Sequence, residues 1–354
     1  MSTDKTDTSQ KRLLYEVSII RPIVIFLLVF LHSFSKIAEG GSRTNDYQLC
    51  TVYQWLCWLI SGFRIETIAL IAGYVFAYQS IDLKRTYQFL PFVWKKFKRL
   101  IIPMLVFGLI YFFCFLFDSA TFELKSFIIQ WFSGCGHLWF LPMLFWCFLA
   151  IWAIDRFKLS SWFTLLLLAG VTLLPPPYKL PFGLSRLPHF VFFVYAGYFL
   201  WTKRTWLFEK GLKNTILVCL WIAYVALMVV RHAYMPETQA TMSVYQKAII
   251  VTVPRIVDLL MSCCGIMALY ISVCMVTTKN GYRLKQRVIN ASDNCYGVYV
   301  YHQFVLVVLY FYSPLVSLIH PLLLPWVGFV IILLISLIMT KVSLKTKIGK
   351  FLIG

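Results

Sequence analysis

Arg21 and His32 are the strongly polar side chains of an otherwise apolar opening stretch, residues 17–34, and they lie eleven residues apart. Eleven steps along an α-helix turn the chain by about 1100°, which is three turns plus about 20°, and raise it by about 16.5 Å. The guanidinium and the imidazole therefore share one helix face, about half a hydrocarbon thickness apart. An arginine within a membrane span costs roughly 2.5–3.5 kcal/mol, so such groups point to function. A fixed cation at one depth and a proton-transfer group at another suit a reaction that reaches across a bilayer.

Glu66 is an acidic residue of the second apolar stretch, which runs back from the outer face if the N-terminus is cytoplasmic. It would then meet His32 at a similar depth. A carboxylate bonded to one imidazole nitrogen fixes the tautomer and raises the basicity of the other nitrogen. We therefore expect Glu66 to orient His32, which deprotonates a hydroxyl group or acts as a transient nucleophile. The simpler alternative is a structural histidine bonded to a neighbouring backbone or hydroxyl group.

The predicted cytoplasmic side of the membrane spans carries cations that suit a phosphate-bearing ligand. The planar fork of Arg21 suits phosphate or carbonyl oxygens, although a snorkelling arginine would look the same. A basic run that includes Lys96 and Arg99 leads straight into the third apolar stretch. We expect it to attract a donor with several phosphates, while the simpler explanation of the run is membrane topology.

Later polar residues in or beside apolar stretches are candidates for substrate contact or for stabilising an oxyanion. They are Arg64, His137, Arg186, Tyr299 and His302. The alternatives are a solvated rim for Arg186, an interface position for His137 and aromatic packing around His302. Arg255 and Asp258 are three residues apart on one predicted helix, so we expect them to pair.

The composition predicts a polytopic membrane protein with an all-α fold. The chain has 354 residues, of which 60% are hydrophobic and 13% charged, and apolar runs recur along its whole length. We expect a single bundle of about ten transmembrane helices. They are predicted near residues 17–37, 52–80, 101–117, 136–154, 162–174, 188–202, 215–231, 248–276, 293–313 and 318–340. The fifth and sixth are short, and later orientations are unchanged only if both cross or both turn back.

The basic residues that give the net charge of +19 are distributed as in a membrane protein and not as in a nucleic-acid-binding protein. Basic residues gather in alternate connections, so the positive-inside rule puts both termini in the cytoplasm. We divide the chain into a cytoplasmic tail (1–16), a transmembrane catalytic domain (17–340) and a basic cytoplasmic tail (341–354). The first tail is polar and lacks a signal-peptide pattern. We expect membrane lipids as partners and no nucleic acid.

The ten cysteines predict no disulfide framework, since most lie inside apolar stretches. A bridge between Cys50 and Cys135 is possible but cannot be inferred from spacing. No Cys or His spacing resembles a metal site, so we expect no metal.

Five blocks in order resemble the acyltransferase-3 family of bacterial integral membrane proteins. Arg21 and His32 resemble its first-helix signature, and Arg64 to Glu66 followed by Ala72-Gly73-Tyr74 resemble its second-helix stretch. The run Lys95 to Pro103 resembles its basic segment. The later blocks are His137-Leu138-Trp139-Phe140-Leu141 and Tyr296-Gly297-Val298-Tyr299-Val300-Tyr301-His302. The resemblance extends from about residue 15 to about residue 340. Lys96 replaces the first arginine of the family's inner Arg-x-x-Arg pattern, which keeps the charge but loses a bidentate fork.

The resemblance implies a roughly ten-helix enzyme of the bacterial cytoplasmic membrane that transfers an acyl group, often acetyl. It implies acyl-CoA, commonly acetyl-CoA, as the cytoplasmic donor and an envelope carbohydrate, a lipid-linked sugar or another small molecule as the acceptor. His32 and Glu66 would be catalytic, and Arg21, Lys96 and Arg99 would bind the donor. Whether transfer takes one step or passes through an acyl-histidine is left open, as are the acceptor and the oligomeric state. The rival function is a transporter or flippase for a glycan or lipid, which explains buried charges equally well.

Overall fold

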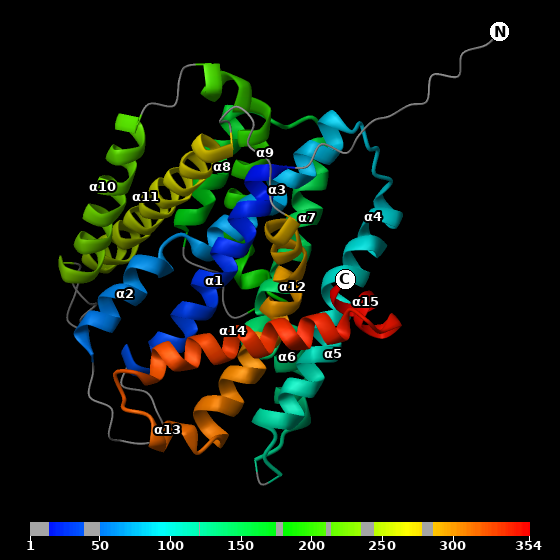
Figure 1. The fold of residues 1–354 in the computed structure, drawn as a ribbon. Coiled ribbons are helices and arrows are strands. Elements are labelled where there is room, and N and C mark those ends of the chain that lie inside the picture. Colours follow the sequence, from blue (N-terminus) through cyan, green and yellow to red (C-terminus); the bar gives the residue numbers. More distant parts are fainter. Residues whose placement is uncertain are drawn as a thin grey trace.

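The computed structural model describes residues 14–38, 50–119, 121–174, 180–209, 214–234, 244–277 and 286–354, and these ranges are helical throughout, with short turns and no strand. Eight helices or continuous helical segments within them are long and apolar enough to cross a membrane. They are Tyr15–Ser35, Thr51–Asp82, Phe89–Leu116, Gly136–Arg156, Asn214–Ala233, Ile250–Thr277, Gln286–Tyr312 and Leu324–Ser343. The predicted all-α polytopic bundle is confirmed (Figure 1). Residues 1–13 of the predicted N-terminal tail lie outside the described ranges.

The fifth and sixth predicted spans are the two that are not among these eight. The fifth is α8 (Trp162–Leu173), whose 12 residues rise only about 18 Å, too short for a hydrocarbon core of about 30 Å. The sixth lies in α9 (Leu187–Glu209), which has 23 residues and packs against α8. The Tyr195 hydroxyl of α9 accepts a hydrogen bond from the Ser161 backbone N–H at 2.8 Å, which holds the start of α8 to this helix.

The predicted second span is two helices, α2 (Thr51–Ser61) and α3 (Arg64–Ala77). The chain breaks at Gly62 and Phe63, where the Gly62 carbonyl accepts a hydrogen bond from Ser262 Oγ at 2.6 Å. A Cβ at Gly62 would lie 2.7 Å from Met261 Cε and 3.0 Å from the Tyr224 hydroxyl, so a larger residue here would require these side chains to shift. The break places Arg64 and Glu66 in the first turn of α3.

Helices α3 and α9 form a tightly packed pair of the core, because glycine lets their backbones approach. A Cβ at Gly73 would overlap the Val194 carbonyl group, and one at Gly197 would overlap the Leu70 carbonyl oxygen. The pair therefore fixes the position of α3 and of the polar residues at its start.

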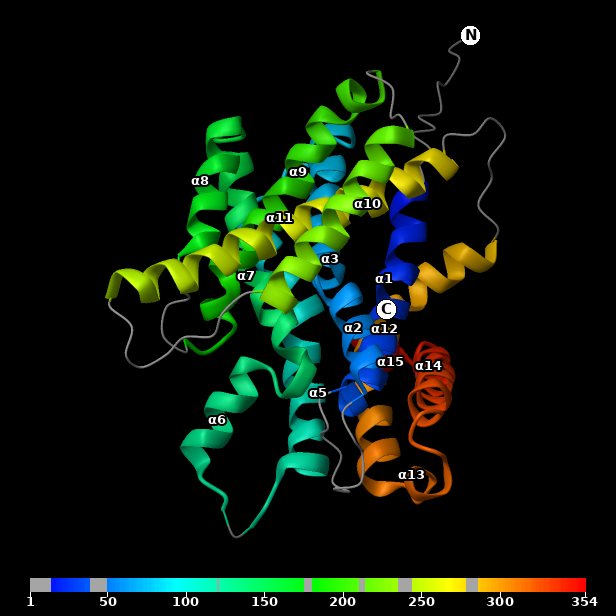
Figure 2. The same cartoon turned by 90° about the vertical axis from the view of Figure 1, so that its left-hand side faces the viewer.

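The remaining elements surround this pair and α1 (Tyr15–Ala38). The third span is one rod built from α4 (Phe89–Lys96), η2 (Phe97–Ile101), α5 (Ile102–Tyr111) and η3 (Phe112–Leu116). The short α6 (Leu124–Ser133) lies at one end of the bundle, before η4 (Gly136–Trp139) and α7 (Phe140–Arg156) (Figure 2). Helix α10 (Asn214–Val229), with η6 (Val230–Tyr234), runs beside α11 (Val244–Thr277) in both views.

The C-terminal fifth of the chain closes the bundle over α1. It consists of α12 (Gln286–Val307), η7 (Val308–Tyr312), α13 (Leu315–Leu318), α14 (Leu324–Ser343) and α15 (Lys347–Ile353). Helices α12 and α14 pack on each other and on α1, and α15 contacts α5 and η2. Cys50 and Cys135 both carry free thiols, so no bridge joins them.

Candidate active site

A cavity of about 350 Å³ opens where α1, α3 and α12 meet the turns before α7 and α9. We call it the histidine cavity. It is lined by six of the residues selected from sequence: His32, Arg64, His137, Arg186, Tyr299 and His302. These residues come from five separate parts of the chain, so only the folded bundle brings them together.

A tight turn before α7 sets the position of His137. Gly134 and Gly136 have φ angles of 83° and 58°, a backbone region that favours glycine. A Cβ at Gly134 would lie 2.7 Å from the Leu138 carbonyl. This turn feeds the short helix η4, which carries His137 and Trp139 to the cavity wall.

Three imidazoles gather in the wall of the cavity. The ring centroids of His32 and His302 are 5.4 Å apart in a stacked arrangement, and those of His137 and His302 are 4.9 Å apart at 75°. Such spacing lets a small group contact more than one ring at once.

The hydrogen bonds of His302 and His137 fix which nitrogen carries the proton. His302 Nδ1 lies 2.6 Å from the Tyr299 carbonyl oxygen, and His137 Nε2 lies 3.0 Å from the Val300 carbonyl oxygen. Because a carbonyl only accepts, each of these nitrogens must donate. That leaves His302 Nε2 and His137 Nδ1 as acceptors, and both are buried without a hydrogen-bond partner among the described residues.

Two arginines supply positive charge to the same cavity. Arg64 is only 7% exposed, and its Nε and Nη1 atoms are buried without hydrogen-bond partners in the described part of the chain. The Arg186 guanidinium lies 3.6 Å from the centroid of the Trp139 ring, and burial lowers its pKa from the ordinary value. Tyr299 is less available, because its hydroxyl donates to the His137 carbonyl oxygen at 2.6 Å.

Glu66 contacts a histidine that sequence reasoning did not select. Its Oε1 lies 3.4 Å from His189 Nε2, at the start of α9, and its Oε2 is buried without a hydrogen-bond partner among the described residues. Glu66 does not line the histidine cavity, although its neighbour Ile65 does. A polar residue at the start of the predicted sixth apolar stretch was the signal that could have identified His189.

The predicted donor-side cations lie away from the histidine cavity. Arg21 is within electrostatic range of Arg99 and Asp293. The Lys96 ammonium lies 3.3 Å from the centroid of the Phe148 ring, and Arg99 donates a hydrogen bond to the Gly354 carbonyl. None of the three lines the histidine cavity beside His32.

The predicted pairing of Arg255 with Asp258 is wrong. Because α10 and η6 pack beside α11, Arg231 Nε reaches Asp258 Oδ1 at 2.8 Å. Arg255 instead donates to the Leu173 carbonyl oxygen at 3.2 Å. Spacing on one helix did not reveal a partner from the neighbouring helix.

Within the described ranges, no group of three or more His, Cys, Asp or Glu side chains could hold a metal ion.

Comparison with known proteins identifies the chain. The model of the acyltransferase domain matches residues 14–341. No curated protein and no solved structure matches the sequence. The matched region contains every residue of the histidine cavity. The chain therefore belongs to the acyltransferase 3 family and is a multi-pass membrane enzyme that transfers acyl groups.

Proposed function

We propose that this membrane acyltransferase moves an acyl group, with acetyl as the first candidate, from cytoplasmic acyl-CoA to a hydroxyl group of an envelope carbohydrate or related acceptor. The reaction takes place in the histidine cavity. The observation that carries the proposal is the convergence of three imidazoles and Arg64 on one cavity, with buried acceptor and donor atoms that lack partners among the described residues. Buried polar groups without partners are rare, and a substrate would satisfy them.

The chemistry needs a base, an electrophile and a stabiliser of negative charge. His32 takes the proton of the acceptor hydroxyl while that oxygen bonds to the thioester carbonyl carbon. The carbonyl oxygen gains the electron pair and is stabilised by Arg64, whose Nε and Nη1 atoms lack hydrogen-bond partners among the described residues. The carbon–sulfur bond then breaks, and the sulfur leaves as a thiol with the proton held by His32.

A two-step route uses the same groups. A ring nitrogen of His32 first bonds to the thioester carbonyl carbon, the carbon–sulfur bond breaks, and the thiolate leaves with the proton that His32 loses. The acceptor hydroxyl then bonds to the same carbon, the carbon–nitrogen bond breaks, and His302 Nε2 takes the hydroxyl proton. The stacked arrangement of His32 and His302 supports both routes.

The remaining predicted residues have supporting roles in this proposal. Glu66 and His189 form a polar pair beside the cavity and hold the first turn of α3. His137, Arg186 and Tyr299 shape the wall that faces the acceptor. Arg21, Lys96 and Arg99 attract the negatively charged donor toward the bundle.

The test is acyl transfer in cells that lack the native protein and express single variants. His32→Ala should remove the acyl mass increment from envelope carbohydrate, a loss of at least about 100-fold, because the step loses its general base. His320→Ala is the matched control, since His320 is exposed near α13 and lies outside the cavity. Near-normal transfer by His32→Ala would refute the assignment. Labelled substrate that crosses liposomes without chemical change would favour the transporter instead.

A further inference from the structure

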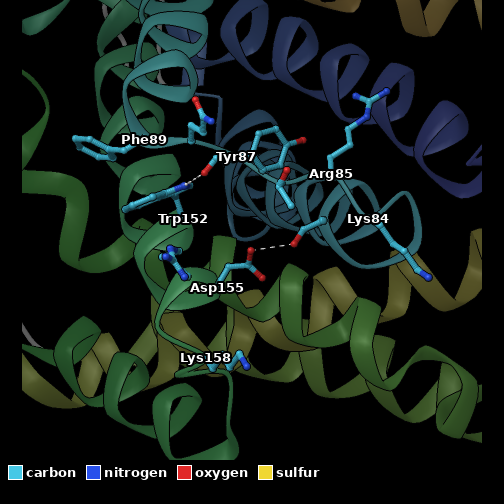
Figure 3. Close-up of a pocket in the computed structure, with 11 residues that line it drawn as sticks. Lys84, Arg85, Tyr87, Phe89, Trp152, Asp155 and Lys158 are labelled. Carbon is cyan, nitrogen blue, oxygen red and sulfur yellow. Dashed lines mark hydrogen bonds between the residues drawn. The ribbon is translucent and has the colours of Figure 1, made fainter.

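A second and larger cavity lies at the opposite end of α3 and α7 from the histidine cavity. Its volume is about 810 Å³, and it is formed by the segment from Ser80 to Phe89 and the segment from Trp152 to Lys158 (Figure 3). We call it the basic pocket, after its four cations Lys84, Arg85, Arg156 and Lys158. None of these residues was selected as a site from the sequence.

The basic pocket carries a surplus of positive charge. It is lined by four cations and one carboxylate, Asp155, and none of the cations forms an ion pair within the described ranges. Both Asp155 oxygens already accept hydrogen bonds, from Ser80 Oγ at 2.9 Å and from the Tyr198 hydroxyl at 2.6 Å. Asp155 is thus held by hydroxyl groups, which leaves the cations available to a ligand with several negative charges.

Aromatic rings form the other wall of the basic pocket. Trp152 Nε1 donates to the Tyr87 carbonyl oxygen at 2.9 Å, and the Phe89 and Trp152 ring centroids are 4.8 Å apart (Figure 3). Planar bases stack on such rings, and the attraction does not depend on base identity. Phosphate-binding cations beside aromatic rings are the combination that a nucleotide requires.

Two lysines at the mouth of the pocket have unusual backbone conformations. Lys84 and Lys158 have φ angles of 48° and 54°, in the left-handed region that most side chains avoid. Each sits in a turn held by backbone hydrogen bonds, Arg85 N–H to the Gln79 carbonyl at 3.0 Å and Leu159 N–H to the Ile154 carbonyl at 3.0 Å. Strain of this kind, held by its surroundings, gathers at ligand sites.

The spacing of the two cavities matches an elongated ligand. On α7, Phe140 lines the histidine cavity and Trp152 lines the basic pocket, and on α3 with η1 (Tyr78–Asp82) the same holds for Ile68 and Ser80. Each pair is separated by 12 residues, or about 18 Å of helix rise. This is the order of length of an extended phosphopantetheine arm. Lys96 lies between the two ends, over Phe148, one helical turn before Trp152.

We propose that the basic pocket binds the phosphate-bearing adenosine end of the acyl-CoA donor, while its thioester end reaches the histidine cavity. The proposal rests on the proposed function and assigns the donor's phosphates to Lys84, Arg85, Arg156 and Lys158. Arg85 and Arg156 supply planar forks suited to phosphate, and Trp152 supplies the stacking surface.

The test compares matched double variants of the full chain in nanodiscs. Arg85→Gln with Arg156→Gln removes two charges from the pocket, whereas Lys345→Gln with Lys347→Gln removes two exposed charges, one between α14 and α15 and one at the first residue of α15. The probe is radiolabelled adenosine 3′,5′-bisphosphate, measured by equilibrium binding, together with KM and kcat for acetyl-CoA. The first pair should weaken binding and raise KM by at least about 10-fold with kcat within about twofold. The control pair should change neither quantity more than about twofold.

Three outcomes would overturn or separate the claims. Unchanged binding and KM in the first pair would overturn the pocket assignment. Nanodiscs of neutral or anionic lipid distinguish the sources of phosphate: a defect that appears only with anionic lipid means that the pocket holds a lipid headgroup, which also overturns it. Binding is measured without turnover, so a chain that binds the nucleotide but transfers nothing refutes the proposed function and leaves standing only the assignment of the basic pocket as a nucleotide site.

Discussion

The histidine cavity and the basic pocket lie at opposite ends of α3 and α7 and are built in opposite ways. The first collects residues from five parts of the chain. Arg64, His137, Tyr299 and His302 are buried, and several polar atoms of the cavity lack partners among the described residues. The second is formed by two short segments, and its four cations are exposed. The difference suggests that the two cavities have different roles: the histidine cavity contacts the reacting atoms, and the basic pocket binds the negative charges of the donor.

The largest expected effect comes from a substitution that prevents the close packing of α3 and α9, because this pair fixes the position of α3. Gly197→Leu places a side chain against the Leu70 carbonyl oxygen, so α3 and α9 cannot keep their close packing. We expect a loss above about 4 kcal/mol and no folded enzyme, measured as loss of monodisperse protein in size-exclusion chromatography. Gly170→Leu on α8 is the control, because no atom lies within 4 Å of a Cβ built there. Normal folding of the Gly197 variant would mean that this contact does not hold the two cavities in place.

Removing the charge of Arg64 from the histidine cavity should slow the chemical step without weakening donor binding. Arg64→Gln deletes donors that we propose stabilise the developing oxyanion, so kcat should fall by about 10²–10³ with KM for acetyl-CoA within about threefold. The measurement is steady-state transfer with purified protein, and thermal unfolding confirms that the variant is folded. A rise in KM at unchanged kcat would mean that Arg64 acts in donor binding and not in the chemical step.

Salt should weaken donor binding at the basic pocket and leave the chemical step in the histidine cavity unchanged. Exposed charges are screened over a Debye length of about 10 Å at 0.1 M salt, whereas buried groups are screened much less. Between about 50 and 200 mM salt, KM for acetyl-CoA should rise several-fold while kcat stays constant. The Arg85→Gln, Arg156→Gln variant should lose most of this salt dependence. An equally steep dependence in that variant would assign the donor's phosphates to other cations.

The smallest expected effect concerns the thiol beside the buried cavity. Burial raises the pKa of Cys135 to about 11, so below that pH the group is a neutral thiol and a poor nucleophile. Cys135→Ser should keep kcat within about twofold, and alkylation of Cys135 should stay slow from pH 7 to 9 and accelerate only as the pH approaches 11. Loss of transfer in Cys135→Ser would point to an acyl-cysteine in place of the histidines.

The same contrast explains what the sequence could predict. A polar residue inside an apolar stretch is costly, so His32, Arg64 and His302 stood out, and all three line one cavity. Arg85 and Arg156 did not stand out, because basic residues fill most connections of a membrane protein whatever their role. The helical class followed from hydropathy, whereas the break at Gly62 and the short α8 depend on packing against distant residues.

The hydrogen-bond and ion-pair partners of the polar residues were harder to predict than the polar residues themselves. Helix spacing placed Arg255 beside Asp258 and left His189 unnoticed, yet the observed partners come from neighbouring helices, Arg231 for Asp258 and Glu66 for His189. In a bundle, a costly side chain is satisfied by whichever helix lies next to it, and a single sequence does not give that neighbour.

The most direct test is a cryo-EM structure of the full chain with a non-transferable thioether analogue of acetyl-CoA. We predict that the acyl end lies among His32, His302 and Arg64, with its oxygen within hydrogen-bond distance of Arg64. An analogue whose acyl end binds away from all three side chains would contradict the account.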